Sequence, residues 1–506
     1  MSTNSLVYEV EGKPSWGKLL VFAFQQVLAV LAATILVPTL IHLPIQMPAA
    51  ILGAGLGTIV YLLFTKFKSP VVISSSFAFL GALGNAVVFG YMGIILGGLF
   101  AGLVYVIIAL VVKFAGTGWI EKLMPPVIIG PTVALIGLSL AGNATADIVK
   151  ASADSINGGY NLIGLLCGLV TFFTVVIFSV QNRFKAGRLI PFILGIVAGY
   201  SVAAIFTGLG YAFKVDYLKV IDYSPIINNF KNLTIESFVT YPRFSLIGGI
   251  KELVNGEVSG EIAAAAAAYG KTAHTITWVG VAEVALAFVP VAFVTFAEHI
   301  ADHKNLSSII GRDLLKEPGL SRTLLGDGVG SMVGTVFGIC PNTTYGESVG
   351  CVAITKNASV RTIFVAACML IVLSFLSPLT AALETIPNCV MGGVCLTLYG
   401  FIAVSGFKMF QKVDLNKSKN LFIVAAILIS GIGGLSLQIP YAVYGETDQA
   451  VVLGEALKGQ VKSVITITSI ATALILGIVT MVICNAIEKR NAPEAEQSEE
   501  QPKEEK

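Results

Sequence analysis

Two stretches of this chain carry carboxylates inside otherwise apolar sequence. The first runs Phe296-Ala297-Glu298-His299-Ile300-Ala301-Asp302-His303, and the second runs Pro341-Asn342-Thr343-Thr344-Tyr345-Gly346-Glu347-Ser348-Val349-Gly350. A charged side chain at membrane depth costs about 2.5–3.5 kcal/mol or more, so a carboxylate retained there is expected to have a function. The second stretch forms helix poorly and leaves backbone hydrogen-bonding groups free, which is typical of a broken helix at a binding site within a membrane. Glu298 and Glu347 are therefore the first candidates for ligand contact.

The other acidic residues allow more than one interpretation. Asp302 follows Glu298 by four residues and shares its helical face. It either faces a cavity with Glu298 or lies among lipid headgroups beside Lys304. Asp327 and Glu384 are expected at the membrane interfaces.

The four histidines show no spacing that indicates a metal site. His299 and His303 form an H-x-x-x-H pair, but Ile300 stands where the zinc-protease motif has glutamate. The chain also has no phosphate-binding loop and no nucleophile motif. We therefore expect no metal, no cofactor and no enzymatic activity.

The composition places these residues in a membrane protein. Of the 506 residues, 55% are hydrophobic and 12% are charged, whereas soluble domains carry about 25% charged residues. The seven cysteines include no C-x-x-C pair and read as reduced packing residues. The net charge of +2 gives no reason to expect a nucleic-acid partner. The fold class is thus all-α and polytopic.

We predict fourteen transmembrane segments. They cover residues 17–40, 47–65, 71–88, 91–114, 125–142, 160–180, 188–209, 277–301, 322–338, 343–355, 360–380, 385–406, 419–436 and 462–487. Segments 71–88 and 343–355 begin with hydroxyl and aromatic residues. Each is predicted to be a short extended piece followed by a half-helix.

Basic residues set the predicted topology. With the N-terminus inside, 23 of the 32 Lys and Arg residues fall on the inner side, and the other nine lie in or beside the longer outer connections 143–159, 210–276 and 437–461. Both termini are therefore expected in the cytoplasm. The alanine run 263–268 is expected to form a short surface helix, and the acidic tail 488–506 is expected to be disordered.

Fourteen segments suggest a seven-plus-seven repeat. A repeat unit with an odd number of spans must cross the membrane in the opposite direction to its copy, so the repeat is expected to be inverted. A weak echo supports this prediction, since Pro125 and Gly130 match Pro387 and Gly392 at one offset, and segments 71–88 and 343–355 correspond.

At these residues the chain resembles the nucleobase–ascorbate transporter family, and within it the uracil:proton symporters. The resemblance rests on Ala297-Glu298-His299, on Pro341 to Glu347, on Ser75 to Phe79 and on Ala33 to Pro38, with further matches at Ala115 to Trp119, Ala353 to Thr355 and Leu398 to Gly400. It implies fourteen segments with short antiparallel strands in segments 3 and 10, divided between a core domain and a gate domain.

The resemblance also implies domain boundaries. The cytoplasmic N-terminus covers 1–16, the outer connection covers 210–276, and the tail covers 488–506. The core domain consists of spans 1–4 within 17–142, of spans 8–10 within 277–355 and of span 11 at 360–380. The gate domain begins with span 5 at the end of 17–142 and continues over 160–209 and 385–487.

The family site implies specific roles here. Glu298 and Glu347 hold the pyrimidine, and the backbone at Phe77 contacts the base. The same pocket is lined by Ala33, Ser76, Tyr345, Gly346 and Tyr399. Uracil is flat and neutral, with two N–H donors for carboxylates and two carbonyls for backbone N–H groups, and an aromatic wall can pack on its ring.

The chain departs from the family pattern in three places, and the first of these concerns the coupling proton. Family symporters carry a histidine four residues after the first glutamate, where this chain has Asp302, with His303 one residue away. Ser348 stands where the family usually has Asn, and residues 249–276 look like an insertion. Proton coupling is therefore assigned to Glu298, Asp302, His299 and His303.

These observations predict a uracil importer of the cytoplasmic membrane, coupled to protons and working by alternating access, with a homodimer through the gate domain implied by the resemblance. The alternative within the family is a purine permease for xanthine or urate, but such members tend to carry Gln where this chain has Glu347. An anion exchanger on the same architecture is the other alternative. It is disfavoured because the site has two acidic residues and no basic one.

Overall fold

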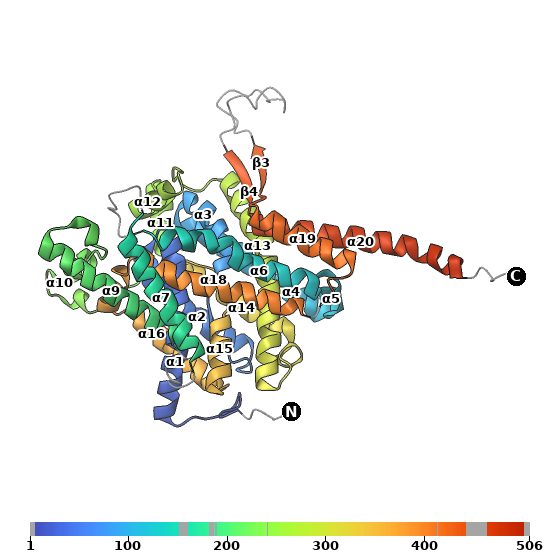
Figure 1. The fold of residues 1–506 in the computed structure, drawn as a ribbon, viewed down its shortest axis with the longest axis horizontal. Coiled ribbons are helices and arrows are strands. Elements are labelled where there is room, and N and C mark those ends of the chain that lie inside the picture. The colour runs from blue at the N-terminus through green and yellow to red at the C-terminus, as the bar shows by residue number, and fades with distance from the viewer. Residues whose placement is uncertain are drawn as a thin grey trace, which may run out of the picture.

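Helices account for most of the chain in the computed structural model (Figure 1). The structure describes residues 6–150, 160–181, 187, 190–239, 241–411, 413–441 and 463–499. Within these ranges, nine helices are long and apolar enough to cross a bilayer. The chain is therefore a multi-pass membrane protein. The count of fourteen stays a prediction, because several of the remaining helices are only 10 to 15 residues long.

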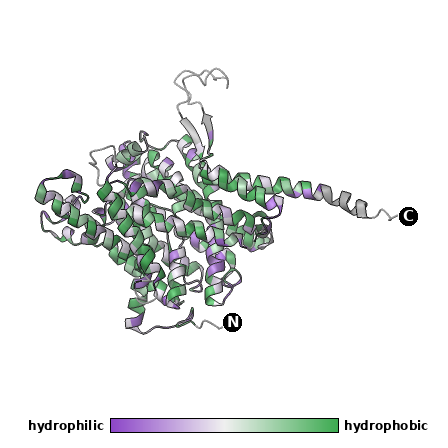
Figure 2. Ribbon diagram, in the orientation of Figure 1, coloured by the Kyte–Doolittle hydropathy of each residue, from purple (hydrophilic) through white to green (hydrophobic). Residues whose placement is uncertain are grey.

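Many large apolar side chains lie on the outside of the bundle. Ile107, Ile177, Ile205 and Ile429 are all more than half exposed, and Figure 2 shows hydrophobic residues along most of the helices. An apolar surface of this extent marks contact with a membrane. These residues therefore face lipid.

The helices pack as two groups. The first helix group consists of α1 (Trp16–Leu40), α2 (Met47–Phe64), α4 (Gly90–Ala115), α13 (Trp278–Ile310), α14 (Leu320–Phe337), α15 (Gly346–Thr355) and α16 (Val360–Leu373). The second helix group consists of α6 (Pro126–Asp147), α7 (Leu162–Val180), α9 (Pro191–Phe213), α18 (Asn388–Phe410), α19 (Ser418–Ile432) and α20 (Ser469–Glu499). Contacts of α13 with α6 and α20, and of α1 with α9, join the two groups.

Glycines set the close packing in the first helix group. Helix α14 carries Gly326, Gly330 and Gly334 four residues apart, so they share one face. A Cβ added at Gly53 of α2 would lie 2.6 Å from the carbonyl oxygen of Gly334, and one at Gly57 would lie 2.8 Å from that of Gly330. Small residues at such contacts let helix backbones approach closely in membranes.

In the second helix group, α6 and α18 pack along each other. Pro125 directly precedes α6 and Pro387 directly precedes α18. Proline suits a helix start, since it has a fixed φ and no N–H to satisfy. The two prolines of the sequence echo thus occupy equivalent positions at the starts of two contacting helices.

A two-stranded antiparallel sheet lies inside the bundle. Strand β1 (Ile73–Ser75) pairs with β2 (Asn342–Thr344), with Ser74 opposite Thr343. After β1 come the 3-10 turns η2 (Phe77–Phe79) and η3 (Val87–Phe89) around α3 (Leu80–Ala86); after β2 comes α15. The backbone N–H and C=O of Ile73 both bond the Thr58 hydroxyl at 3.1 Å, and the Asn342 amide donates to the Gly53 carbonyl at 2.9 Å. These bonds satisfy polar groups that a short buried strand would otherwise leave unpaired.

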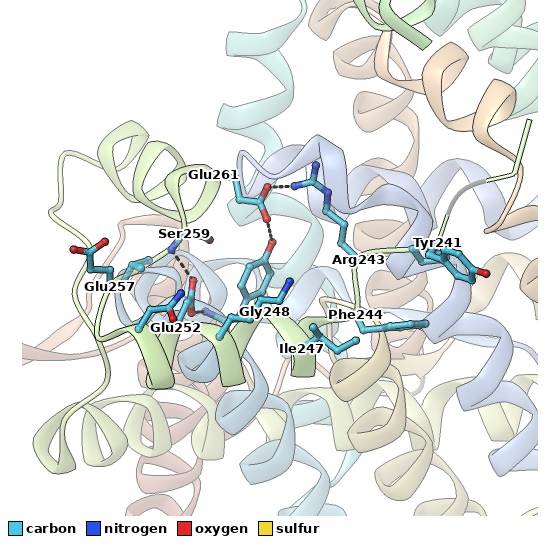
Figure 3. Close-up of a pocket in the computed structure, with 14 residues that line it drawn as sticks. Tyr241, Arg243, Phe244, Ile247, Gly248, Glu252, Glu257, Ser259 and Glu261 are labelled. Atoms are coloured by element: carbon cyan, nitrogen blue, oxygen red, sulfur yellow. Dashed lines mark hydrogen bonds and ion pairs between the residues drawn. The ribbon is translucent and has the colours of Figure 1, made fainter. Parts of the chain in front are cut away.

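The connection 210–276 folds as short helices, and those within residues 245–268 dock on the start of α4 (Figure 3). It contains α10 (Ser224–Phe230), α11 (Ser245–Asn255) and α12 (Gly260–Ala268), together with the 3-10 turns η4 (Asp216–Leu218) and η5 (Ile235–Ser237). The buried Glu252 carboxylate accepts from the Tyr91 and Ser259 N–H groups at 2.7 and 3.0 Å. Glu261 bonds both Arg243 and the Tyr91 hydroxyl. The helix predicted for the alanine run is confirmed as α12.

Several predicted boundaries are wrong. Segment 360–380 is broken, because α16 ends at Leu373 and Pro378 begins a separate helix, α17 (Ser377–Glu384). Segment 462–487 begins as a strand, since β4 (Ser463–Ile467) pairs with β3 (Leu437–Tyr441) and consists mainly of β-branched residues.

The tail prediction is wrong over residues 488–499, which continue α20. Helix-favouring Glu, Ala and Gln residues of this stretch offset its proline. Figure 1 shows α20 extending beyond the bundle. The last part of the tail, 500–506, lies outside the described residues. The short π-helix η6 (Leu315–Gly319) and the helix α5 (Gly118–Leu123) join longer helices, and the 3-10 turn η1 (Pro44–Gln46) precedes α2.

Candidate functional site

Glu347 lies in the first turn of α15, directly after β2. The backbone N–H groups of a first helical turn have no partner within the helix. The helix dipole also places positive potential there, which stabilises a carboxylate. Both Glu347 and Gly346 border a cavity, where Glu347 is half-buried and Gly346 is exposed. The site therefore combines a carboxylate acceptor with backbone donors.

Three contacts hold the start of α15 against β1 and α1. The Tyr345 hydroxyl donates to the Ser75 carbonyl at 2.7 Å. The buried Ser348 hydroxyl donates to the Gln26 side chain at 3.0 Å and accepts from the Val72 N–H, also at 3.0 Å. Ser348, which stands where the family usually has Asn, thus holds the start of α15 and with it Glu347 by bonding Gln26 and Val72.

Replacing Ser348 with Ala is expected to destabilise the protein by about 1–3 kcal/mol, because the buried Val72 N–H loses its acceptor. The measurement is the thermal unfolding temperature of the protein in detergent. The control is Ser201→Ala on α9, where an exposed hydroxyl bonds only its own helix at the Val197 carbonyl. Equal unfolding temperatures for the two variants would show that the Ser348 contacts do not hold α15.

Asp302 of α13 contacts Thr344, the last residue of β2. Its carboxylate accepts from the Thr344 hydroxyl at 2.9 Å, and its other oxygen lies 3.9 Å from where a Cβ of Gly346 would be. Lys304, by contrast, is exposed. Of the two interpretations of Asp302, the structure supports the one in which this residue joins the carboxylates rather than the headgroup region.

Glu298 lies one turn before Asp302 on α13 and is half-buried. Asp302, Glu347 and Asp327 lie close enough to interact with it electrostatically. None of the salt bridges among the described residues pairs Glu298, Asp302 or Glu347 with a cation. The structure thus brings the carboxylates of both sequence stretches into one region.

A cavity of about 570 Å³ opens beside Glu347 between the two helix groups. Helices α1 and α15 form one wall, and α7, α9 and α18 form the other. On the second wall, the rings of Phe192 and Phe401 meet edge to face with centroids 6.1 Å apart. A ligand at Glu347 would therefore touch both helix groups.

The remaining predicted ligand contacts lie around the strand pair. The Phe77 ring packs edge to face on Tyr399 of α18, with centroids 5.6 Å apart. The Ser76 N–H donates to the Pro341 carbonyl at 2.9 Å, and its buried hydroxyl has no partner among the described residues. Ala33 is fully buried on α1, next to Thr34, whose hydroxyl bonds that of Ser74 at 2.8 Å.

The two histidines of α13 lie apart from Glu347 and bond neighbouring helices. His299 contacts Asp327 through Nδ1 at 2.7 Å and Thr323 through Nε2 at 3.0 Å, both on α14. His303 contacts the Tyr61 hydroxyl of α2 at 2.7 Å, and the two imidazoles stack.

The expected interfacial position of Asp327 is wrong, because its side chain is 1% exposed. The signal in the sequence was its flanking Gly326 and Gly328. Gly328 packs on Gly102 of α4, so this part of α14 is buried among helices. Glu384, at the end of α17, is half-buried.

Comparisons with known proteins identify the family of this chain. The model of a permease family, Xan_ur_permease, matches residues 17–439. A uracil permease of Bacillus caldolyticus is 36% identical over 439 residues, covering 86% of this chain and 90% of the relative. A uracil permease of Escherichia coli K12 is 33% identical over 434 residues, covering 85% and 88%.

Among solved structures, the anion transporter SLC26A9 is similar in fold. One structure of it gives a TM-score of 0.57 at 12% identity, covering 93% of this chain and 65% of the other. The murine protein in its inward-facing state gives 0.54 at 10% identity, covering 94% and 69%. At these identities the likeness concerns the fold alone.

Proposed function

Because the chain belongs to the Xan_ur_permease family of transporters, we propose that it imports uracil across the cytoplasmic membrane. The observation that carries this proposal is the Glu347 carboxylate, held at the start of α15 beside the strand pair and open to a cavity. Its oxygens would accept from the N–H groups of the base, and free backbone N–H groups would serve the carbonyls. The names of the relatives, uracil permeases, support the same ligand.

The test of this proposal is competition for labelled uracil on the purified protein by a panel of nucleobases. Uracil should displace the label, whereas xanthine and urate should not, because a site matched to one set of donors discriminates against others. Displacement of the label by xanthine or urate at lower concentrations than unlabelled uracil requires would favour the purine alternative.

The two helix groups correspond, in this proposal, to a core domain and a gate domain that move against each other. The cavity beside Glu347 has walls from both groups, and Phe77, which follows β1, contacts Tyr399 of α18. The strand–helix pairs β1–α3 and β2–α15, together with the proline-led helices α6 and α18, support a seven-plus-seven inverted repeat. Both termini would lie in the cytoplasm, and a homodimer would form through the gate.

Proton coupling would use the carboxylates around Glu298. Like charges in one region repel each other, and a bound proton relieves that repulsion. Asp302 lies one turn from Glu298 on α13, in the direction of Lys304. We therefore propose that Glu298 carries the proton and that Asp302 relays it, while His299 and His303 with Asp327 and Tyr61 form the buried network behind them.

The variant Asp302→Asn is expected to keep uracil binding and exchange but to slow net, proton-driven uptake severalfold, because an amide cannot release a proton. The measurement is uptake into vesicles between pH 5.5 and 7.5. Asp313→Asn is the matched control, since Asp313 is a partly exposed carboxylate beyond the end of α13. If Asp302→Asn vesicles take up uracil like the wild type at every pH, Asp302 is not the relay.

A further inference from the structure

The cavity beside Glu347 is larger than a single-ring base requires. Its volume of about 570 Å³ falls within the range of about 300–1,000 Å³ that holds drug-sized ligands. It follows one face of α15 from Glu347 through Gly350 to Ile354, and one face of α18 from Phe401 to Lys408. Each pair of end points is seven residues, or about 10 Å, apart along its helix.

The end of the cavity away from Glu347 carries its own polar groups. Lys408 lies in the last turn of α18, is exposed, and pairs with no carboxylate among the described residues. Ser179 lies near the end of α7, and its buried hydroxyl has no hydrogen-bond partner within the described part of the chain. Both residues line the cavity. Lys356 directly follows α15 and Lys408 lies in the last turn of α18, so this is the end predicted to face the cytoplasm.

We propose that this end is an anion subsite, and that the whole cavity admits a pyrimidine nucleoside monophosphate from the cytoplasm as an inhibitor of uracil transport. The proposal rests on the uracil site proposed above. A nucleotide retains the N3–H donor of its base, which would bond Glu347. Its phosphate would lie about two helical turns away, where the Lys408 ammonium and the Ser179 hydroxyl offer donors.

The walls between the two ends suit the rest of such a ligand. Phe192 and Phe401 meet edge to face there and offer apolar surface for the sugar. Because α18 and α7 belong to the second helix group and α15 to the first, a nucleotide spanning from Glu347 to Lys408 would bind both groups. It would therefore hold them in the arrangement in which the cavity is open, and a transporter held in one arrangement does not turn over.

The experiment measures displacement of labelled uracil from the purified full-length protein by uridine 5′-monophosphate, uridine and inorganic phosphate. The monophosphate is expected to compete at least about tenfold better than uridine, as one charge-assisted contact would give. Phosphate alone should not displace uracil. Lys408→Gln should remove the advantage of the monophosphate while leaving uracil affinity unchanged, and Lys408→Arg should retain it.

Lys417→Gln is the matched control, because Lys417 is an exposed lysine just before α19 that does not line the cavity. Equal competition by the monophosphate and uridine would overturn the inference, as would an advantage that persists in Lys408→Gln. In that last case Lys408 would serve only to stabilise the end of α18. A protein that fails to bind uracil at all would instead refute the proposed function.

Discussion

Replacing Glu347 with Gln is expected to weaken uracil binding by about a hundredfold or more while leaving the fold intact. The amide keeps the size of the side chain but presents an NH₂ group toward the N–H donors of the base. The lost charge-assisted hydrogen bond costs about 1.5–3 kcal/mol, and the buried donor left unpaired costs about 1–3 kcal/mol. Because Glu347 lies at the open cavity and bonds no other side chain that the structure describes, its replacement should not disturb the packing.

The measurement is the dissociation constant of uracil for the purified variant, alongside its thermal unfolding temperature. Glu257→Gln is the control, since Glu257 is exposed on the outer connection far along the chain from the site. An unchanged dissociation constant for Glu347→Gln would remove Glu347 from the site and with it the main support for the proposed binding mode.

Replacing Glu298 with Gln is expected to abolish the response of uptake to a pH gradient. The proposed role of Glu298 is to bind and release the coupling proton, and an amide does neither. A charge on Glu298 would be repelled by charges on Asp302, Glu347 and Asp327, so the neutral glutamine should also reduce the charge repulsion in this region. Uptake should therefore fall at least about tenfold under an inward proton gradient and equal the rate measured without one.

This prediction is measured as labelled uracil uptake into liposomes with and without an acidic exterior. Uracil exchange in the absence of any gradient shows whether the variant still binds and transports. If Glu298→Gln liposomes retain a gradient response while exchanging uracil normally, the coupling proton is bound elsewhere.

The sequence was sufficient to single out the carboxylates that the structure brings into one region. A carboxylate inside an apolar run is costly in lipid, so the apolar residues around Glu298 and Glu347 are enough to mark these two carboxylates as candidates. The short extended pieces were also readable, because Ser74 to Phe79 and Thr343 to Tyr345 interrupt otherwise apolar segments. These features depend on local sequence, and local sequence is what hydropathy measures.

Other features depend on which helices meet, and hydropathy carries no such information. Asp327 lies near the end of an apolar segment, which made an interfacial position reasonable, yet His299 of another helix bonds it in the interior. Ser348 bonds Gln26, 322 residues away in sequence. Hydropathy also gives no reason to connect Lys408 with Glu347, whereas in the structure both residues line one cavity.

Boundaries failed for a further reason. Hydropathy does not distinguish a buried strand from a buried helix over a few residues, so β4 was taken into the last span. Proline at position 378 was compatible with a continuous span by composition, but the structure starts a new helix there.

The central claim is that this chain couples uracil import to proton entry through the carboxylates around Glu347. Its most direct test is labelled uracil uptake into liposomes that hold only the purified protein, under either an imposed proton gradient or an imposed sodium gradient. An acidic exterior is expected to drive accumulation, and a protonophore is expected to abolish it. Accumulation under the sodium gradient, with none under the proton gradient, would contradict this claim.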